Sequence, residues 1–137
     1  MSDHGDVIAA NKAFYAAFAA FDIDTMSALW QRDQAATCIH PGWELCRGWP
    51  AVLHSWRLIF AGGDGMEFRV DEVDCHVVGE VGRVHCVENI FSSEGDRVGR
   101  VVATNVFVKS GGAWRMVLHH GSVSMATPSS SQHVEFH

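Results

Sequence analysis

The stretch VVATNVFVKSGGAWRMVLHHGSVSM, residues 101–125, decides how the rest of the chain folds. It consists of two runs rich in β-branched and aromatic residues, joined by Ser110-Gly111-Gly112. A glycine-rich break between two such runs predicts a β-hairpin. With Val108 paired to Ala113 across the turn, the hairpin has two long strands whose side chains alternate between two faces.

One face of this hairpin is expected to be apolar except for three polar side chains, Asn105, His120 and Ser122. The other face would carry Thr104, Arg115 and His119. An apolar face with a few polar groups suits the wall of a ligand pocket. It equally suits an ordinary core in which each polar group has found a partner.

Length and composition indicate one domain over residues 1–126, followed by a tail at 127–137 without periodicity. A net charge of −6 and ten scattered Lys and Arg residues exclude a nucleic-acid partner. No apolar run approaches the ~20 residues that span a bilayer, so no membrane partner is expected. The acidic start MSDHGDV is unlike a signal peptide, and we expect a cytoplasmic protein.

The order of the predicted elements indicates an α+β fold, with helices first and an antiparallel meander after them. Three helices are expected near residues 3–20, 24–30 and 50–60, with Asp3 or Asp6 capping the first and Asp24 the second. Short and long strands are expected at 36–39, 67–78, 82–92, 97–109 and 113–125, with a bulge near Asp71-Glu72.

An acidic residue joins the polar group of the hairpin. Pairing across the turn at Glu94–Asp96 places Glu88 opposite Val101, on the face expected for His120; a one-residue slip would turn it outward. Burial in an apolar cavity raises the pKa of a carboxyl group, and an acid with an imidazole can transfer protons. Glu88 and His120 are therefore the candidate catalytic residues; the alternative is a buried pair that only holds the strands.

Histidine and cysteine patterns do not predict a metal site or another cofactor. His119 and His120 are neighbours on a strand, so they point to opposite faces and cannot enter one site together. The four cysteines have no C-x-x-C spacing and are expected to be free thiols. A disulfide or metal at Cys75 and Cys86 is the alternative, since they lie on neighbouring predicted strands.

Aromatic residues support a cavity near the third helix. Trp43 and Trp49 flank an irregular segment and are expected at the mouth of a pocket, whereas packing alone explains Trp56. Asn11 lies on the apolar stripe of the first helix, and Tyr15 lies four residues later on an adjoining edge. They either bond within the core or face a cavity.

Three pieces of the chain resemble the NTF2-like superfamily, most closely its SnoaL-like branch, over about residues 7–125. They are NKAFYAAFAAFDIDTMSALW (11–30), CIHPGW with GW and SWRLIF (38–60), and HCVEN with ATNVFVKSGGAWRMVLHHGSVS (85–124). The resemblance implies a curved sheet wrapped around the helices as a cone, a pocket in its concave side, and a homodimer formed through the outer sheet face. It carries over the pocket positions Tyr15, Trp30, His40, Trp43, Glu88, Asn105 and His120.

The superfamily includes steroid isomerases, polyketide cyclases, dehydratases, epoxide hydrolases, and non-catalytic association and transport domains, so fold alone leaves the function open. Our first hypothesis is proton transfer (isomerisation, cyclisation or hydration) on a small apolar or polycyclic molecule. Glu88 or His120 would be the base and Asn105 an orienting donor, with Trp49 among the ligand contacts. The second is a non-catalytic dimeric binding or association domain that uses Thr104, Arg115 and His119.

Overall fold

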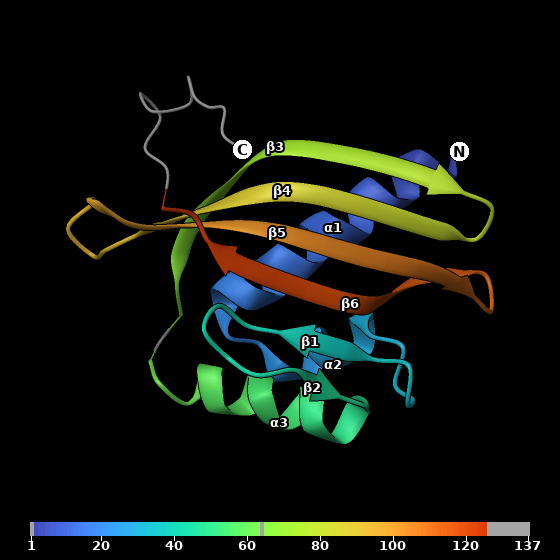
Figure 1. Ribbon diagram of the computed structural model, residues 1–137, viewed down its shortest axis with the longest axis horizontal. Helices are drawn as coiled ribbons and strands as arrows, with labels where there is room; N and C mark the ends of the chain where they lie inside the picture. The colour runs from blue at the N-terminus through green and yellow to red at the C-terminus, as the bar shows by residue number, and fades with distance from the viewer. Residues whose placement is uncertain (1, 64, 126–137) are drawn as a thin grey trace.

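A computed structural model describes residues 2–63 and 65–125. Its elements are α1 (Asp3–Ala20), α2 (Ile23–Leu29), β1 (Thr37–Ile39), β2 (Cys46–Arg47), α3 (Trp49–Phe60), β3 (Glu67–Val78), β4 (Val81–Phe91), β5 (Arg97–Ser110) and β6 (Ala113–Val123). Figure 1 shows the four long strands as one layer, with α1 crossing one face of it. The predicted α+β class, with helices packed on a curved, mostly antiparallel sheet, is confirmed. The predicted tail at 127–137 lies outside the described residues.

The six strands form one sheet in the order β2-β1-β6-β5-β4-β3. Every pairing is antiparallel except that of β1 with β6, where Ile39 lies opposite His120. The short strand β2 had no signal in the sequence. Because β1 runs parallel to β6, the residue that follows it, His40, lies beside the second half of β6, where its side chain contacts Ser55 of α3.

The helices begin at different capping residues from those expected. Ser2 caps α1, since its Oγ accepts a hydrogen bond from the Gly5 amide at 3.1 Å. Asp22 caps α2 by accepting from the Thr25 amide, so the expectation of Asp24 was wrong by two residues. Asp3 instead accepts a hydrogen bond from Lys109 and ties α1 to the end of β5.

The core lies between α1 and the concave face of the sheet. Val7, Phe14 and Phe18 follow one face of α1 and are buried. Gly82 allows this close approach, because a Cβ there would lie 2.7 Å from a methyl carbon of Val7. A larger residue at Gly82 would push α1 away from β4.

The register of the β5–β6 hairpin differs from the expected one, with consequences for the site. The turn holds only Gly111 and Gly112, both with positive φ, so Ser110 pairs with Ala113. The ladder then shifts by one residue between Val106 and Phe107, where β6 contains an extra residue. An extra residue in one strand turns the side chains after it to the opposite face. The second half of β6 therefore presents the residues that were expected outside.

The predicted pairing of Glu88 with Val101 across β4 and β5 is confirmed, but nearer the turn the ladder shifts between Ile90 and Phe91, so that Phe91 pairs with Arg97. The bulge expected in β3 is also present, since its pairing with β4 shifts between Asp71 and Asp74. Glu72 at this bulge has a φ of 55°, a backbone conformation that L residues seldom adopt.

Candidate functional site

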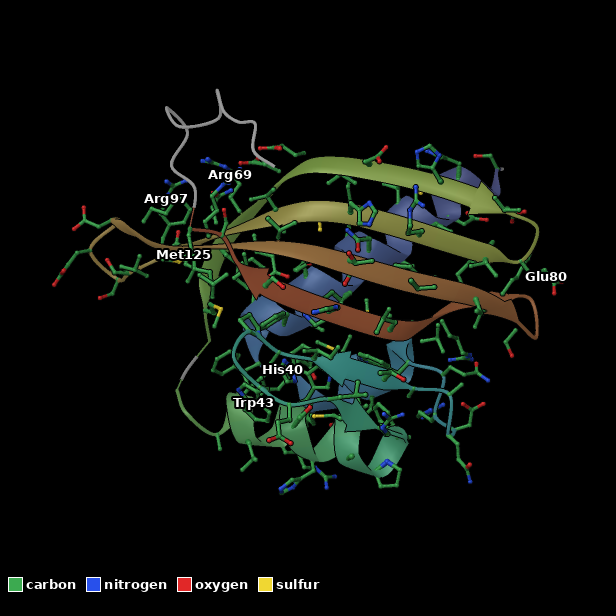
Figure 2. All side chains as sticks on the ribbon, in the orientation of Figure 1. His40, Trp43, Arg69, Glu80, Arg97 and Met125 are labelled. Atoms are coloured by element: carbon green, nitrogen blue, oxygen red, sulfur yellow. The ribbon has the colours of Figure 1, made fainter. Side chains whose placement is uncertain are left out.

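A cavity of about 240 Å³ opens between the concave sheet face, the end of α1, α3 and the loop after β1. We name it the acid–imidazole cavity. Figure 2 shows His40 and Trp43 close together, above α3, where β1 ends. Most of its wall is apolar, and the lining residues are Phe18, His40, Pro41, Trp43, Ile59, Met66, Glu88, Ile90, Val101 and His119.

Glu88 reaches the cavity from β4 and is only 4% exposed. The hydroxyl of Tyr15, on α1, donates a hydrogen bond to its Oε2 at 2.6 Å. Burial raises the pKa of Glu88 to about 7, and the Tyr15 hydrogen bond partly opposes that rise. At neutral pH both the acid and the carboxylate forms of Glu88 are therefore populated.

His119 reaches the same cavity from β6 and is held by Asn105, a neighbour across the β5–β6 ladder. The Nδ1 of His119 lies 2.6 Å from the Oδ1 of Asn105. The Nδ2 of Asn105 donates to Asn11 at 2.9 Å and to the Tyr15 hydroxyl at 3.1 Å. Because the Tyr15 proton goes to Glu88, that hydroxyl must accept from Asn105, which leaves the Asn105 oxygen facing His119.

This network fixes the tautomer of His119. Its Nδ1 carries the proton that Asn105 accepts, so Nε2 keeps its lone pair. Burial, helped by the neighbouring His40 and His120, lowers the pKa of His119 to about 3. Its Nε2 lies 4.0 Å from Oε2 of Glu88, and at neutral pH this contact joins a neutral imidazole to a carboxyl group rather than forming an ion pair.

His40 contributes a second neutral imidazole. Ser55 donates its hydroxyl proton to the carbonyl of Val52 at 2.6 Å and therefore accepts from Nε2 of His40 at 2.9 Å. Burial lowers the pKa of His40 to about 4. The Trp43 ring lies 4.9 Å from that of His40 and is 41% exposed, which places Trp43 at the mouth of the cavity.

The geometry can move protons within an apolar space. A neutral imidazole nitrogen and a carboxyl group of pKa near 7 lie 4.0 Å apart and line one cavity. One can accept a proton while the other donates one, which is the requirement for general acid–base chemistry.

His120, expected to face inward beside Glu88, is exposed, and the prediction of its position was wrong. It pairs with Thr104 on the outer face, and His119 occupies the place assigned to it. The cause is the extra residue in β6, which reverses the facing of the side chains that follow. The same reversal removes His119 from the outer-face group in which we expected it beside Thr104 and Arg115.

The other predicted ligand contacts divide into three groups. His40 and Trp43 line the cavity. Tyr15 and Asn105 are buried behind it and bond to Glu88 and His119, so Asn105 orients an imidazole rather than a ligand. Trp30 is fully buried against Met26, and Trp49 packs on Trp30, so neither contributes to the wall.

Sequence reasoning missed His119 and Ser55. His119 had no available signal, because it faces inward only through the extra residue in β6, and the two-glycine turn does not reveal that residue. Ser55 had none, since its role depends on α3 packing beside the end of β1.

Three further features of residues 2–63 and 65–125 concern metal ligands, thiols and membrane-spanning helices. No three His, Cys, Asp or Glu side chains in these ranges are grouped as metal ligands would be. The four cysteines are free thiols. None of the helices described is both long enough and apolar enough to cross a membrane.

Comparison with known proteins identifies one family over nearly the whole chain. The SnoaL-like domain model matches residues 7–126. The Arabidopsis thaliana F-box protein SKIP8 is 30% identical over 119 residues, which are 87% of this chain and 50% of that protein. The chain thus spans about half the length of this curated relative.

Two solved structures are similar in both sequence and fold. A candidate dehydratase of the NTF2-like family from Streptomyces avermitilis is 36% identical with a TM-score of 0.82, covering 90% of this chain and 97% of that one. A candidate calcium/calmodulin-dependent protein kinase type II association domain from Thiobacillus denitrificans is 34% identical with a TM-score of 0.81, covering 86% and 94%.

Proposed function

The chain belongs to the SnoaL-like domain family of the NTF2-like superfamily, and we propose that it is an enzyme that removes water from a small, largely apolar β-hydroxy carbonyl compound. The observation that carries this proposal is the pair of His119 Nε2 and Glu88 Oε2, 4.0 Å apart beside one apolar cavity. The similarity to a candidate dehydratase supports the reaction class.

The two groups have complementary roles in this reaction. Nε2 of His119 takes the proton from the carbon next to the carbonyl group, and the C–H electrons form the new double bond. The C–O bond at the next carbon breaks as protonated Glu88 gives its proton to the leaving hydroxyl, which departs as water. Hydration of the double bond is the same path in reverse.

The charges produced in this step stabilise each other. After the transfer His119 is an imidazolium and Glu88 a carboxylate, and their opposite charges lie close together in a poorly solvated space. This attraction offsets the low basicity that burial gives to the free imidazole. Return of the proton from His119 to Glu88 restores both groups for the next turnover.

The cavity also limits the size and shape of the substrate. About 240 Å³ is just below the usual range for drug-sized ligands and favours a single ring over the polycyclic compounds considered from the sequence. Phe18 and Trp43 offer flat walls for such a ring. We therefore propose a one-ring β-hydroxy ketone as the substrate class.

The test is a panel of one-ring β-hydroxy ketones, with formation of the conjugated enone followed by ultraviolet absorbance. We expect His119→Phe and Glu88→Gln to lower kcat about 10²–10⁴-fold, as loss of a general base or acid does. His120→Phe is the matched control, because it changes the adjacent but exposed imidazole and is expected to keep the wild-type rate. Equal rates in the His119→Phe variant and the wild type would refute the mechanism.

A second candidate function is homodimeric association through the outer sheet face. The observation in its favour is that Val102, in the middle strand β5, is 45% exposed on that face. An association domain among the similar structures supports it. Analytical ultracentrifugation should show that Val102→Glu weakens the dimer, whereas Val78→Glu, at the exposed β3–β4 turn, does not; a monomeric wild type would exclude it.

A further inference from the structure

A second cavity lies between α1 and β3, on the other side of Tyr15 from the acid–imidazole cavity. We name it the Lys12 cavity. Its volume is about 300 Å³, within the range of small-molecule sites. It shares no lining residue with the acid–imidazole cavity, and it is formed by Ile8, Asn11, Lys12, Tyr15, Val70 and Val73.

Two local features of the backbone create this space. The four α1 residues that line it have the spacing i, i+3, i+4 and i+7, so they follow one face of the helix. On the opposite wall, the pairing of β3 is interrupted between Asp71 and Asp74. Val70 precedes this bulge and Val73 lies within it, where the strand departs from its regular path.

The walls and the rim of the Lys12 cavity differ in chemistry. Ile8, Val70 and Val73 provide an apolar lining, whereas Lys12 is exposed at the edge. Within the described part of the chain, Lys12 makes no ion pair. The acidic groups of the neighbouring bulge do have partners: Asp71 bonds to Arg69, Glu72 to Arg100 and Asp74 to His76.

We propose that the Lys12 cavity binds a small apolar carboxylate, such as a medium-chain fatty acid. The apolar body would contact Ile8, Val70 and Val73, and the carboxylate would pair with the Lys12 ammonium at the rim. This proposal is independent of the dehydration reaction, since it uses neither Glu88 nor His119 as a ligand contact.

The floor of the Lys12 cavity belongs to the network that holds the acid–imidazole pair. Tyr15 donates to Glu88, and Asn11 accepts from Asn105, which in turn positions His119. A ligand on this floor contacts two residues of the network and shifts the positions of both reactive groups. The Lys12 cavity is thus an effector site for the acid–imidazole cavity.

The experiment titrates the full chain with sodium octanoate and follows the side-chain methyl resonances by NMR. We expect saturable shifts at Ile8, Val70 and Val73, together with a shift of the His119 imidazole nitrogens but not of those of His120. Lys12→Met should weaken octanoate about two- to fivefold, as loss of an exposed ion pair does, and Lys12→Arg should restore it. Lys109→Met, which removes a lysine that does not line the cavity, should leave the affinity unchanged.

Four results would overturn all or part of the proposal. Octanoate shifts confined to Ile90 and Val101 would place the ligand in the acid–imidazole cavity instead. Equal affinity in Lys12→Met and wild type would exclude the carboxylate pairing. Unchanged octanoate binding in Val73→Trp, whose indole should fill the Lys12 cavity, would exclude this location. Unshifted resonances of the His119 imidazole nitrogens would exclude the effector role. None of these results changes the rates measured on the ketone panel without octanoate. Those rates test the proposed reaction separately.

Discussion

Two asparagines in adjacent strands, both almost completely buried, occupy clusters of opposite character. Asn105 belongs to the inner cluster, defined as Asn11, Tyr15, Glu88, Asn105 and His119, whose members are joined by hydrogen bonds. Asn89 belongs to the outer cluster, defined as Arg69, Asp71, Asn89 and Arg97, at the end of the sheet where Figure 2 shows the two arginines together.

The two clusters differ in whether their ionisable side chains keep the charge that they have in water. The outer cluster pairs permanent ions that remain in contact with water, and Arg69 is 67% exposed. The inner cluster buries groups whose protonation then changes: burial raises the pKa of Glu88 to about 7 and lowers that of His119 to about 3. In the outer cluster the asparagine bonds to permanently charged side chains. In the inner cluster it orients a neutral histidine beside a carboxyl group.

Replacing each asparagine with alanine is expected to give the largest difference between the two clusters in the free energy of unfolding. Asn105→Ala leaves buried polar atoms of Asn11 and His119 without a partner and should lower the free energy of unfolding by about 3 kcal/mol. Asn89→Ala should cost about 1 kcal/mol, because water can replace the amide beside Asp71 and Arg97. Urea denaturation of both variants tests this, and equal losses would mean that the two clusters are equivalent.

The next largest effect is the dependence of stability on pH that comes from Glu88. Its folded pKa of about 7 exceeds the ordinary value of 4.5, so its contribution to stability is complete below about pH 4.5 and is lost as pH rises through 7. The stability of Glu88→Gln relative to wild type should therefore rise by about 3 kcal/mol between about pH 4 and pH 8. The contributions of His40 and His119 have the opposite sign but occur in both proteins and cancel. A constant difference in urea denaturation across this range would contradict the assignment.

A smaller effect concerns the hydrogen bond between α1 and β4. Tyr15→Phe removes the donor that favours the charged form of Glu88, so the pKa of Glu88 should rise further. The loss of stability should be about 1 kcal/mol. Carboxyl carbon NMR reports the pKa directly, and a fall in that value would show that the bond does not stabilise the carboxylate.

The smallest effect is expected in the outer cluster. Arg69→Ala removes an exposed ion pair to Asp71, with N–O distance 3.3 Å, and should cost less than about 1 kcal/mol. That loss should decrease with added salt. A larger, salt-independent loss in thermal denaturation would show that Arg69 acts mainly through its stacking on Phe91.

The sequence contained enough information for the fold class, because hydrophobic periodicity changes from helical to alternating near residue 67. It also predicted the pairing of Glu88 with Val101, although it did not predict the shift of the ladder between Ile90 and Phe91. It could not predict the extra residue in β6, because Val117 resembles its neighbours and both registers bury an apolar run followed by a histidine. The wall of the acid–imidazole cavity depends on packing between distant segments. The sequence alone therefore could not show that Trp43 lines the cavity and Trp30 does not.

The adjacent histidines of β6 mean that the hairpin presents an imidazole to the concave face with or without its bulge. If Val117 instead entered the regular ladder and paired with Val106, every later residue of β6 would shift by one position, so His120 would lie on the concave face and His119 outside. An imidazole would still approach Glu88. Deletion of Val117 would leave His119 in place, because Asn105 would still lie opposite it.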